Sequence, residues 1–319
     1  MPRSTIIFGN GLGMALDPQY FRLESALRSV WNGSEDFHPE HKRLVQSALP
    51  NLNEAEYPQT EAQLDQLQVA LLAAKFLRSF ETRETRWLAE KAQQLPEAFV
   101  RFIHEVAAYF HEAEWVLPPE FVQSLSSYVS DSASHVATLN YDCLLYDALT
   151  NSGVLAGYGG TLLDGFHRSG FDNSNMDRYD ATRKAWFLHL HGSPLFIGNR
   201  KMMREARNLF KPDEDAHIVL TDVKHKPLLI ERSPILSAYW LRLHEALAES
   251  DSVVLFGYSG EDTHLNQSIS DRIRDSRVAV VEWSGAGETS DRENYWKAAL
   301  KCQELQLHLM PNILQFREW

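Results

Sequence analysis

The chain has 319 residues, 44% of them hydrophobic and 23% charged, which is typical of a globular protein and excludes a disordered or fibrous chain. Its formal net charge of −12 argues against general nucleic-acid binding, because that activity needs Lys and Arg to neutralise phosphates. The two cysteines, Cys143 and Cys302, are too few for a four-cysteine zinc module, and the apolar pattern around Cys143 predicts a buried thiol. No apolar stretch approaches the roughly 20 residues that span a bilayer, so we expect a cytoplasmic protein that does not enter the membrane.

The first predicted element is a strand over residues 5–8, which runs directly into alternating glycines: Gly9, Gly11 and Gly13, with Asn10 between the first two. Dinucleotide-binding folds begin in this way, because glycine permits a positive φ and lets the backbone approach a pyrophosphate. The spacing G-x-G-x-G is not the full G-x-G-x-x-G fingerprint. A tight turn without a ligand therefore stays an alternative.

Residues 17–133 differ in character from the rest of the chain. Apolar side chains recur there at helical spacing in two series: Leu64, Leu67, Leu71 and Ala74, then Phe99, Ile103, Val106 and Phe110. Helix boundaries are predicted at Pro58, Pro96 and Pro118–Pro119. We predict four or five helices inserted between the first and second strands of the sheet. Their aromatic residues, including Trp87 and Trp115, are expected to form core or a subunit interface.

From residue 135 onward, strands and helices alternate. Strands are predicted at 135–139, 185–191 (with a hairpin as one continuation), 217–220, 252–256, 278–281 and 304–309, and helices at 143–151, 233–249, 263–274 and from 291. This alternation predicts an α/β fold with a doubly wound, mostly parallel, Rossmann-like sheet. We assign residues 1–16 and 134–319 to one catalytic domain and residues 17–133 to the helical insertion.

Four of these strands end in turns of unusual composition, which are Gly9–Gly13, Asn140–Asp142, His191–Ser193 and Gly257–Asp262. The carboxyl ends of parallel strands lie along one edge of the sheet, so the four turns can converge on one crevice. For Asn140 and Asp142 the alternative is that they only cap the following helix.

The four turns, in this order, resemble those of the sirtuin superfamily, and in particular the zinc-less sirtuin-like NAD hydrolases of bacterial anti-phage defence. Sirtuins carry a glycine-rich first turn, a T-x-N-x-D motif, a catalytic histidine in H-G, and a later G-T-S or G-Y-S turn. The matching segments are Gly9–Gly13, Thr138–Asp142, His191–Gly192 and Gly257–Ser259. The resemblance covers the sheet framework, roughly 60% of the chain. Two features depart from the deacylating sirtuins: the low cysteine count, and Gly13, where many sirtuins have serine.

The resemblance implies that NAD is the substrate and is cleaved to nicotinamide and ADP-ribose without a metal. Asn140 would orient the nicotinamide ribose or the attacking water, and His191 would act as the general base. Asp142 would hold the carboxamide or order the loop, and Glu282 would reach an adenosine ribose hydroxyl. The other expected contacts to NAD come from the glycine turns and their neighbours: Gly9, Asn10, Gly11, Gly13, Gly192, Ser193, Gly257, Tyr258, Ser259 and Asp262.

An enzyme that destroys NAD would be toxic if it were always active. We therefore expect control by homo-oligomer assembly, by a separately encoded partner such as an ATPase, or by a phage-derived trigger. Three other functions stay open: an NAD or ADP-ribose sensor without turnover, a sirtuin-type deacylase, and a metal-dependent hydrolase. The last would use His189 and His191 with ligands from among Asp142, Asp262 and His264. For His189 we favour a core histidine bonded to the backbone, and for His264 a residue in the first turn of a helix.

Overall fold

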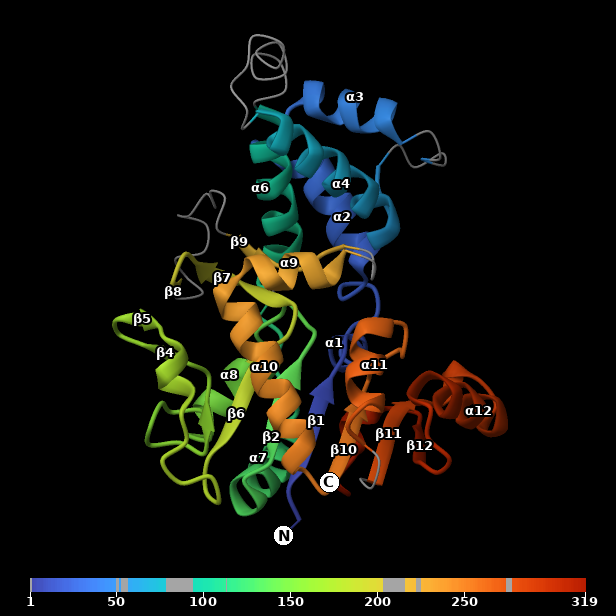
Figure 1. Ribbon diagram of the computed structural model, residues 1–319. Helices are drawn as coiled ribbons and strands as arrows, with labels where there is room; N and C mark the ends of the chain where they lie inside the picture. Colours follow the sequence, from blue (N-terminus) through green and yellow to red (C-terminus); the bar gives the residue numbers. More distant parts are fainter. Residues whose placement is uncertain are drawn as a thin grey trace.

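The computed structural model describes residues 2–49, 52, 57–78, 94–112, 114–202, 216–221, 225–273 and 277–319. Its centre is a sheet of seven strands in the order β12-β11-β10-β1-β2-β6-β3 (Figure 1), and every neighbouring pair runs parallel. The strands are β1 (Ser4–Phe8), β2 (His135–Thr138), β3 (Leu162–Leu163), β6 (Ala185–His189), β10 (Ser252–Phe256), β11 (Arg277–Trp283) and β12 (Gln306–Met310). The predicted α/β fold with a parallel Rossmann-like sheet is confirmed.

The chain builds the sheet in both directions from β1. It first adds β2 and β6 on one side, and then returns to place β10 on the other side of β1, followed by β11 and β12. The strand order therefore reverses between β1 and β10. In open α/β sheets the ligand crevice forms at the carboxyl ends of the strands at such a switch point.

Both faces of the sheet are buried, because neighbouring side chains of β1 belong to different core clusters. Ile6 and Phe8 face one cluster and Ile7 faces the other, and all three side chains are fully buried. The first face is covered by α7 (Pro119–Ser132) and α8 (Leu144–Asn151). The second is covered by α10 (Pro234–Glu249), α11 (Thr263–Ser270) and α12 (Thr289–Leu300).

Two small antiparallel sheets flank the central one. The first pairs β4 (Phe166–His167) with β5 (Gly170–Phe171), and the second pairs β7 (Gly192–Ile197) with both β8 (Arg200–Lys201) and β9 (Ala216–Ile218). The hairpin expected after residues 185–191 exists, but β7 and β8 form it while β6 stays in the parallel sheet. The helix α9 (Lys226–Arg232), which follows β9, was not predicted. Its sequence is short, charged and begins with Lys226–Pro227, so it carries little apolar periodicity.

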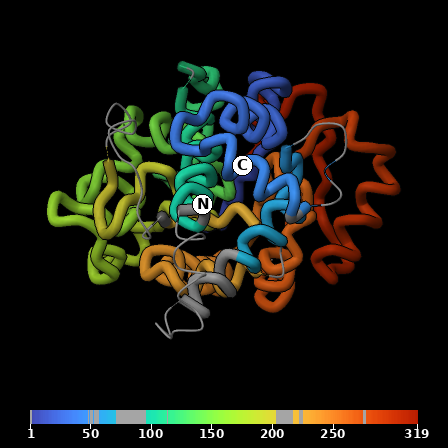
Figure 2. Tube along the Cα trace, turned by 90° about the horizontal axis from the view of Figure 1, so that it is seen from above, coloured from blue at the N-terminus to red at the C-terminus, as the bar shows by residue number. Residues whose placement is uncertain are grey.

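The described chain between β1 and β2 is helical, as predicted. Besides α7 it contains α1 (Gly11–Met14), α2 (Leu23–Gly33), α3 (Pro39–Ala48), α4 (Glu61–Arg78) and α6 (Gln94–Tyr109). The four helices α2, α3, α4 and α6 stand together beyond the carboxyl ends of the sheet strands, and we call them the helical arm (Figure 1). Seen from above, the arm lies over the middle of the molecule, between β3–β5 on one side and α12 on the other (Figure 2).

Helix α7 differs from the arm because it packs on the sheet, where the Phe121 ring lies 5.4 Å from that of Phe256. The predicted proline boundaries fit: Pro119 begins α7 and Pro96 lies in the first turn of α6, where a missing N–H costs no helical hydrogen bond. Trp115 is 36% exposed beside Phe21, and Trp87 lies outside the described residues. No helix in the described ranges is both long and apolar enough to cross a membrane.

Candidate active site

The turns after β10, β1, β2 and β6 lie side by side, because these four strands are consecutive in the sheet. Backbone hydrogen bonds join each turn to the next strand: Gly9 N donates to Phe256 O, Leu139 N to Phe8 O and Leu190 N to Thr138 O, each at 2.9 Å. The predicted convergence of the four turns therefore follows directly from the strand order.

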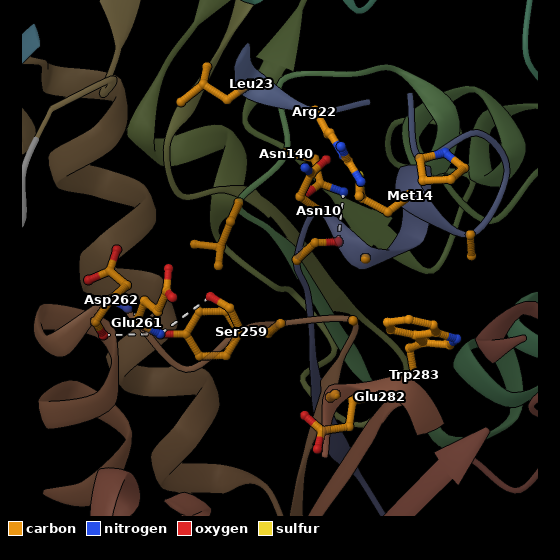
Figure 3. A pocket seen from close by; sticks show the side chains of 18 of the residues that line it. Asn10, Met14, Arg22, Leu23, Asn140, Ser259, Glu261, Asp262, Glu282 and Trp283 are labelled. Carbon is orange, nitrogen blue, oxygen red and sulfur yellow. Dashed lines mark hydrogen bonds between the residues drawn. The ribbon is translucent and has the colours of Figure 1, made fainter. Parts of the chain in front are cut away.

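A cavity of about 1350 Å³ opens at this edge of the sheet. Most of the predicted site residues line it, namely Gly9, Asn10, Gly11, Asn140, Asp142, His191, Gly257, Tyr258, Ser259, Asp262 and Glu282. The helical arm contributes another wall through residues 59–62 at the start of α4. Figure 3 shows Asn10 and Asn140 on one side of the cavity, Glu282 and Trp283 on another, and Asp262 with Glu261 on a third, at the left of this view.

Three predicted contact residues lie outside this lining, and each makes close contacts with other parts of the chain. A Cβ on Gly13 would lie 2.5 Å from the Phe21 ring, and one on Gly192 would lie 1.7 Å from the carbonyl oxygen of His217. Gly192 also has a φ of +83°, so only glycine suits both its conformation and its space. The Ser193 hydroxyl accepts a hydrogen bond from Leu195 N at 3.2 Å.

The first glycine turn packs backbone to backbone against the turn after β10. Gly11 N donates to Gly257 O at 2.8 Å, and a Cβ on Gly11 would lie 2.6 Å from the Cα of Gly257. In the turn after β10, Gly257 has a positive φ of +59°. In the first turn, Gly9, Gly11 and Gly13 have no positive φ. The first turn therefore does not use the positive φ that glycine permits. These glycines permit two turns to touch, and this contact forms the floor of the cavity at the switch point.

Asn140 presents an unsatisfied acceptor at the cavity. Its side chain is 5% exposed, and its Nδ2 donates to Gly9 O at 3.1 Å, which fixes the orientation of the amide. The structure gives Oδ1 no hydrogen-bond partner among the described residues. A buried carbonyl oxygen without a partner costs about 1–3 kcal/mol, so it is expected to accept a hydrogen bond from a ligand.

His191 and Asp262 form a buried dyad. The Nε2 of His191 lies 3.1 Å from Oδ2 of Asp262, and both side chains line the cavity. The other oxygen of Asp262 accepts from the backbone N–H groups of His264 and Leu265 at 3.1 Å each, so Asp262 is also the N-cap of α11. A carboxylate fixed in this way holds one ring nitrogen of the histidine and leaves the other for proton transfer.

Lys226, the first residue of α9, is a third member of this group that sequence reasoning missed. It is 4% exposed, and its Nζ lies 3.0 Å from the same Oδ2 of Asp262 and 3.4 Å from Oε2 of Glu61 in α4. Burial by itself would raise the pKa of Asp262, but the hydrogen bond and charge of His191, together with Lys226, outweigh burial and lower it. Asp262 is therefore ionised at neutral pH. The unpredicted helix α9 explains why Lys226 was overlooked.

Asp142 and Tyr141 complete this end of the cavity. Asp142 Oδ1 accepts from Leu144 N at 3.0 Å, which agrees with the alternative that it orders the start of α8. Burial raises the pKa of the Asp142 carboxyl to about 6. The Tyr141 hydroxyl donates to Val219 O at 2.6 Å, and its ring centroid lies 6.4 Å from that of His191.

At the opposite end, Glu282 is held by a bidentate ion pair. Both of its oxygens accept from the guanidinium of Arg292 at 2.8 Å, and Trp296 Nε1 donates to Oε2 at 3.1 Å. The neighbouring Trp283 is 62% exposed and lines the cavity, so it offers a flat apolar surface to a ligand. Neither Arg292 nor Trp283 was singled out from the sequence.

Arg22, at the start of the arm, is another residue that sequence reasoning missed. It lines the cavity and lies near Asn10 and Asn140 in Figure 3. Lys226 and Arg292 also line the cavity, but each is paired with a carboxylate, whereas the structure gives Arg22 no ion pair within the described ranges. Arg22 is thus a cation available to an anionic ligand.

The two histidines of the H-x-H pattern lie in different environments. His189 is a core histidine, as we favoured, with its ring 4.9 Å from that of Phe187 and 5.2 Å from that of Phe196. Burial lowers its pKa to about 3. The expected bond to the backbone is not found at Nδ1, which has no partner among the described residues. His264 lies in the first turn of α11, as expected, with its ring 4.5 Å from that of Trp240.

The alternative metal site would need three or more ligands together. The part of the chain that the structure describes contains no such group of His, Cys, Asp or Glu side chains. His191 and Asp262 do meet, but the third charged group at Asp262 is the ammonium of Lys226. A cation at this position repels a metal ion, so the geometry disfavours the metal-dependent hydrolase.

The comparison with protein families agrees with this geometry. The sequence profile of the SIR2-like domain matches residues 134–300, which is more than half of the chain and contains the turns after β2, β6 and β10. No curated protein matches the chain. The SIR2-like domain binds NAD, and proteins that carry it are NAD-dependent enzymes. The chain therefore belongs to the SIR2-like domain family.

Proposed function

We propose that this protein is an NAD+ hydrolase that breaks the bond between nicotinamide and ribose. Water supplies the nucleophile, so the products are nicotinamide, ADP-ribose and one proton. The observation that carries the proposal is the meeting, in one cavity, of a histidine–aspartate dyad and an asparagine whose amide oxygen has no partner among the described residues.

In this reaction His191 takes the proton from water or from a ribose hydroxyl while the ring is held by Asp262. General-base catalysis of this kind contributes about 10²–10⁴ to a rate. Asn140 Oδ1 accepts a hydrogen bond from the same water or hydroxyl and so places it against the anomeric carbon. The leaving group is neutral nicotinamide, so the site needs no strong acid to protonate it.

The rest of the cavity suits the remainder of NAD. Arg22 lines the cavity as a cation and would bind the negatively charged pyrophosphate. The glycine turns would let the pyrophosphate approach the backbone closely, rather than bind it through the N–H groups of Gly9 and Gly11, since these already donate to Phe256 O and Gly257 O. Glu282 and Trp283 also line the cavity, which supports a hydrogen bond from a ribose hydroxyl to Glu282 and stacking of adenine on Trp283. We propose NAD contacts for the predicted residues that line the cavity, and structural support for Gly13, Gly192 and Ser193.

Hydrolysis suits this cavity better than transfer of an acyl group from a protein. Residues 59–62 of the arm line the cavity beside Lys226 and Asp262, which favours a small nucleophile such as water at the dyad over a protein substrate. The chain also has only two cysteines, so it cannot form the four-cysteine zinc site of the deacylating sirtuins. Of the two, Cys143 is buried and Cys302 is half-buried. We further propose that the protein acts in anti-phage defence by depleting NAD. Its control would then come from homo-oligomer assembly, or from a partner or phage-derived trigger that acts through the arm.

The test is to measure nicotinamide and ADP-ribose released from NAD by the wild type, by Asn140→Ala and by His191→Ala. Circular dichroism should show that all three proteins are folded. We expect turnover in the wild type and a loss of about 10²-fold or more in each variant. Full turnover in both folded variants would refute the assigned roles. Tight NAD binding by calorimetry without turnover, in any oligomeric state, would identify a sensor instead.

A further inference from the structure

One face of α4 is directed toward a segment before and at the start of α9, described at residues 220–221 and 225–226. Glu61, Asp65 and Gln68 are spaced by four and three residues, so they lie on the same face of the helix. Each of them bonds to this segment: Glu61 to Lys226, Asp65 to Thr221 and His225, and Gln68 to the carbonyl oxygen of Leu220. The arm is therefore fastened to the catalytic domain by a row of polar contacts.

Lys226 lies at the end of this row and also belongs to the dyad. Burial would lower the pKa of its ammonium group, but the charges of Glu61 and Asp262 outweigh burial and raise it, so Lys226 is a buried cation. Its Nζ and the Nε2 of His191 share the same oxygen of Asp262, at 3.0 and 3.1 Å. A cation on that oxygen reduces the negative charge that His191 experiences, and Glu61 in turn reduces the effect of the cation.

We propose that Lys226 is a positioning residue through which the helical arm regulates the site: Glu61 of α4 holds Lys226, Lys226 holds Asp262, and Asp262 holds His191. This inference rests on the proposed NAD hydrolase function. When the arm is docked, Glu61 shares the charge of Lys226. When a partner or a second copy displaces α4, the whole charge acts on Asp262, and His191 becomes a weaker base.

The relay predicts pH shifts of opposite sign for two substitutions. Among the described residues, the charged and titratable groups that face this cluster are Asp262, His264, Lys226, Glu61, Tyr141 and Tyr258. Lys226→Met removes a positive charge, so the acid limb of the pH–rate profile should move to higher pH by about one unit. Glu61→Gln removes a negative charge and leaves Lys226 uncompensated, so the limb should move to lower pH by about half a unit. If Lys226 had only a structural role, the two substitutions would not shift the acid limb in opposite directions.

The matched control is Lys201→Met. Lys201 also pairs with a buried carboxylate, that of Asp164 at 2.5 Å, but neither residue lines the cavity. This variant should leave the pH–rate profile unchanged. An active wild type in which the two test variants shift the acid limb in the same direction, or not at all, would overturn the relay while leaving the hydrolase function intact.

If the wild type proves inactive on NAD, a measurement on the ligand-free protein tests whether Lys226 links α4 to Asp262. Amide hydrogen exchange should quicken at least about tenfold in the first turns of both α4 and α11 in Lys226→Met, because that lysine joins the two helices. Lys201→Met should change neither. Unchanged exchange at α4 in Lys226→Met would overturn the relay, whereas quickened exchange with an inactive wild type would refute only the hydrolase.

Discussion

Each end of the cavity contains a buried carboxylate paired with a cation, but the two ends differ in whether all their polar groups have hydrogen-bond partners. At the end formed by Glu282, the carboxylate accepts hydrogen bonds from Arg292 at both oxygens and from Trp296 as well. At the end formed by His191, Nε2 of His191 and Nζ of Lys226 share one oxygen of Asp262, and the amide oxygen of Asn140 lacks a partner among the described residues. We call these the Glu282 end and the His191 end.

This difference predicts which end of the cavity can strengthen its contacts as charge moves during the reaction. A satisfied ion pair is rigid and gives a ligand the same contacts before and during the reaction, which affects binding only. An unsatisfied acceptor and a shared carboxylate can form stronger bonds as charge moves, which affects the rate. Substitutions at the His191 end should therefore lower kcat, and those at the Glu282 end should raise KM.

The largest effect is expected from Asp262→Asn. The amide cannot supply the negative charge that holds His191, so kcat for NAD cleavage should fall by about 10²–10⁴-fold with little change in KM. Steady-state kinetics measure both constants. Asp164→Asn, which removes a buried carboxyl outside the cavity, is the control. A change confined to KM in Asp262→Asn would contradict the contrast between the two ends.

Asp142 gives the His191 end a pH-dependent stability. The pKa of its carboxyl is about 6 in the folded protein and 3.8 in an unfolded chain, so the folded state binds more protons between these values. The stabilisation is complete below about pH 4 and is lost as the pH rises through about 6. The free energy of unfolding of the wild type should therefore fall over this window by about 2–3 kcal/mol relative to Asp142→Asn.

Urea unfolding at a series of pH values measures this difference. Asp131→Asn, at an exposed position of α7, should follow the wild type throughout. Parallel curves for the wild type and Asp142→Asn would mean that the Asp142 carboxyl titrates normally.

The glycine contact between the two ends should be intolerant of a methyl group. Gly11→Ala places its Cβ 2.6 Å from the backbone of Gly257, so one turn must move. We expect a loss of about 1–3 kcal/mol in the free energy of unfolding. The control is Gly33→Ala at the end of α2, where a Cβ would have no neighbour within 4 Å and stability should hold or rise slightly. Equal stability of the two variants would show that the turns can separate freely.

The smallest effect is expected from Arg292→Met at the Glu282 end. Loss of the ion pair frees the carboxylate to move, so KM for NAD should rise by about tenfold while kcat is kept. Lys297→Met, on the same helix but in a surface ion pair with Glu293, should have normal kinetics. If kcat fell as much in Arg292→Met as in Asp262→Asn, the two ends would not differ in their effects on kcat and KM, and the contrast would be wrong.

The sheet and the convergence of its turns could be predicted because they depend on local patterns. Strands such as 252–256 are apolar runs, and each is followed within one or two residues by glycine or a polar group. Asn140 and His191 were identified at such positions and Asp262 at the end of the longer turn after 252–256, and all three line the cavity. Gly192 and Ser193 were identified by the same reasoning but lie outside its lining, because adjacency in sequence does not decide which way a turn faces.

Local patterns could not identify four charged residues that line the cavity, namely Lys226, Glu61, Arg22 and Arg292. They reach the cavity from helices whose sequences contain no motif, and Glu61 lies 165 residues before the lysine that it contacts. Charged side chains at the ends of helices are usually solvated, so nothing in the local sequence separates these four from the other basic and acidic residues.

The amino-acid sequence by itself determined the parallel α/β sheet, the helices between its first two strands, and the residue types at the strand ends, since these follow from hydrophobic periodicity and backbone sterics over a few residues. Only the tertiary structure decided that Lys226 joins Asp262 to Glu61 and that the first glycines allow contact with Gly257. It also decided that the amide oxygen of Asn140 has no partner within the described ranges. Each of these depends on the distance between segments far apart in the chain, and that distance is set by how the helical arm and the sheet pack together.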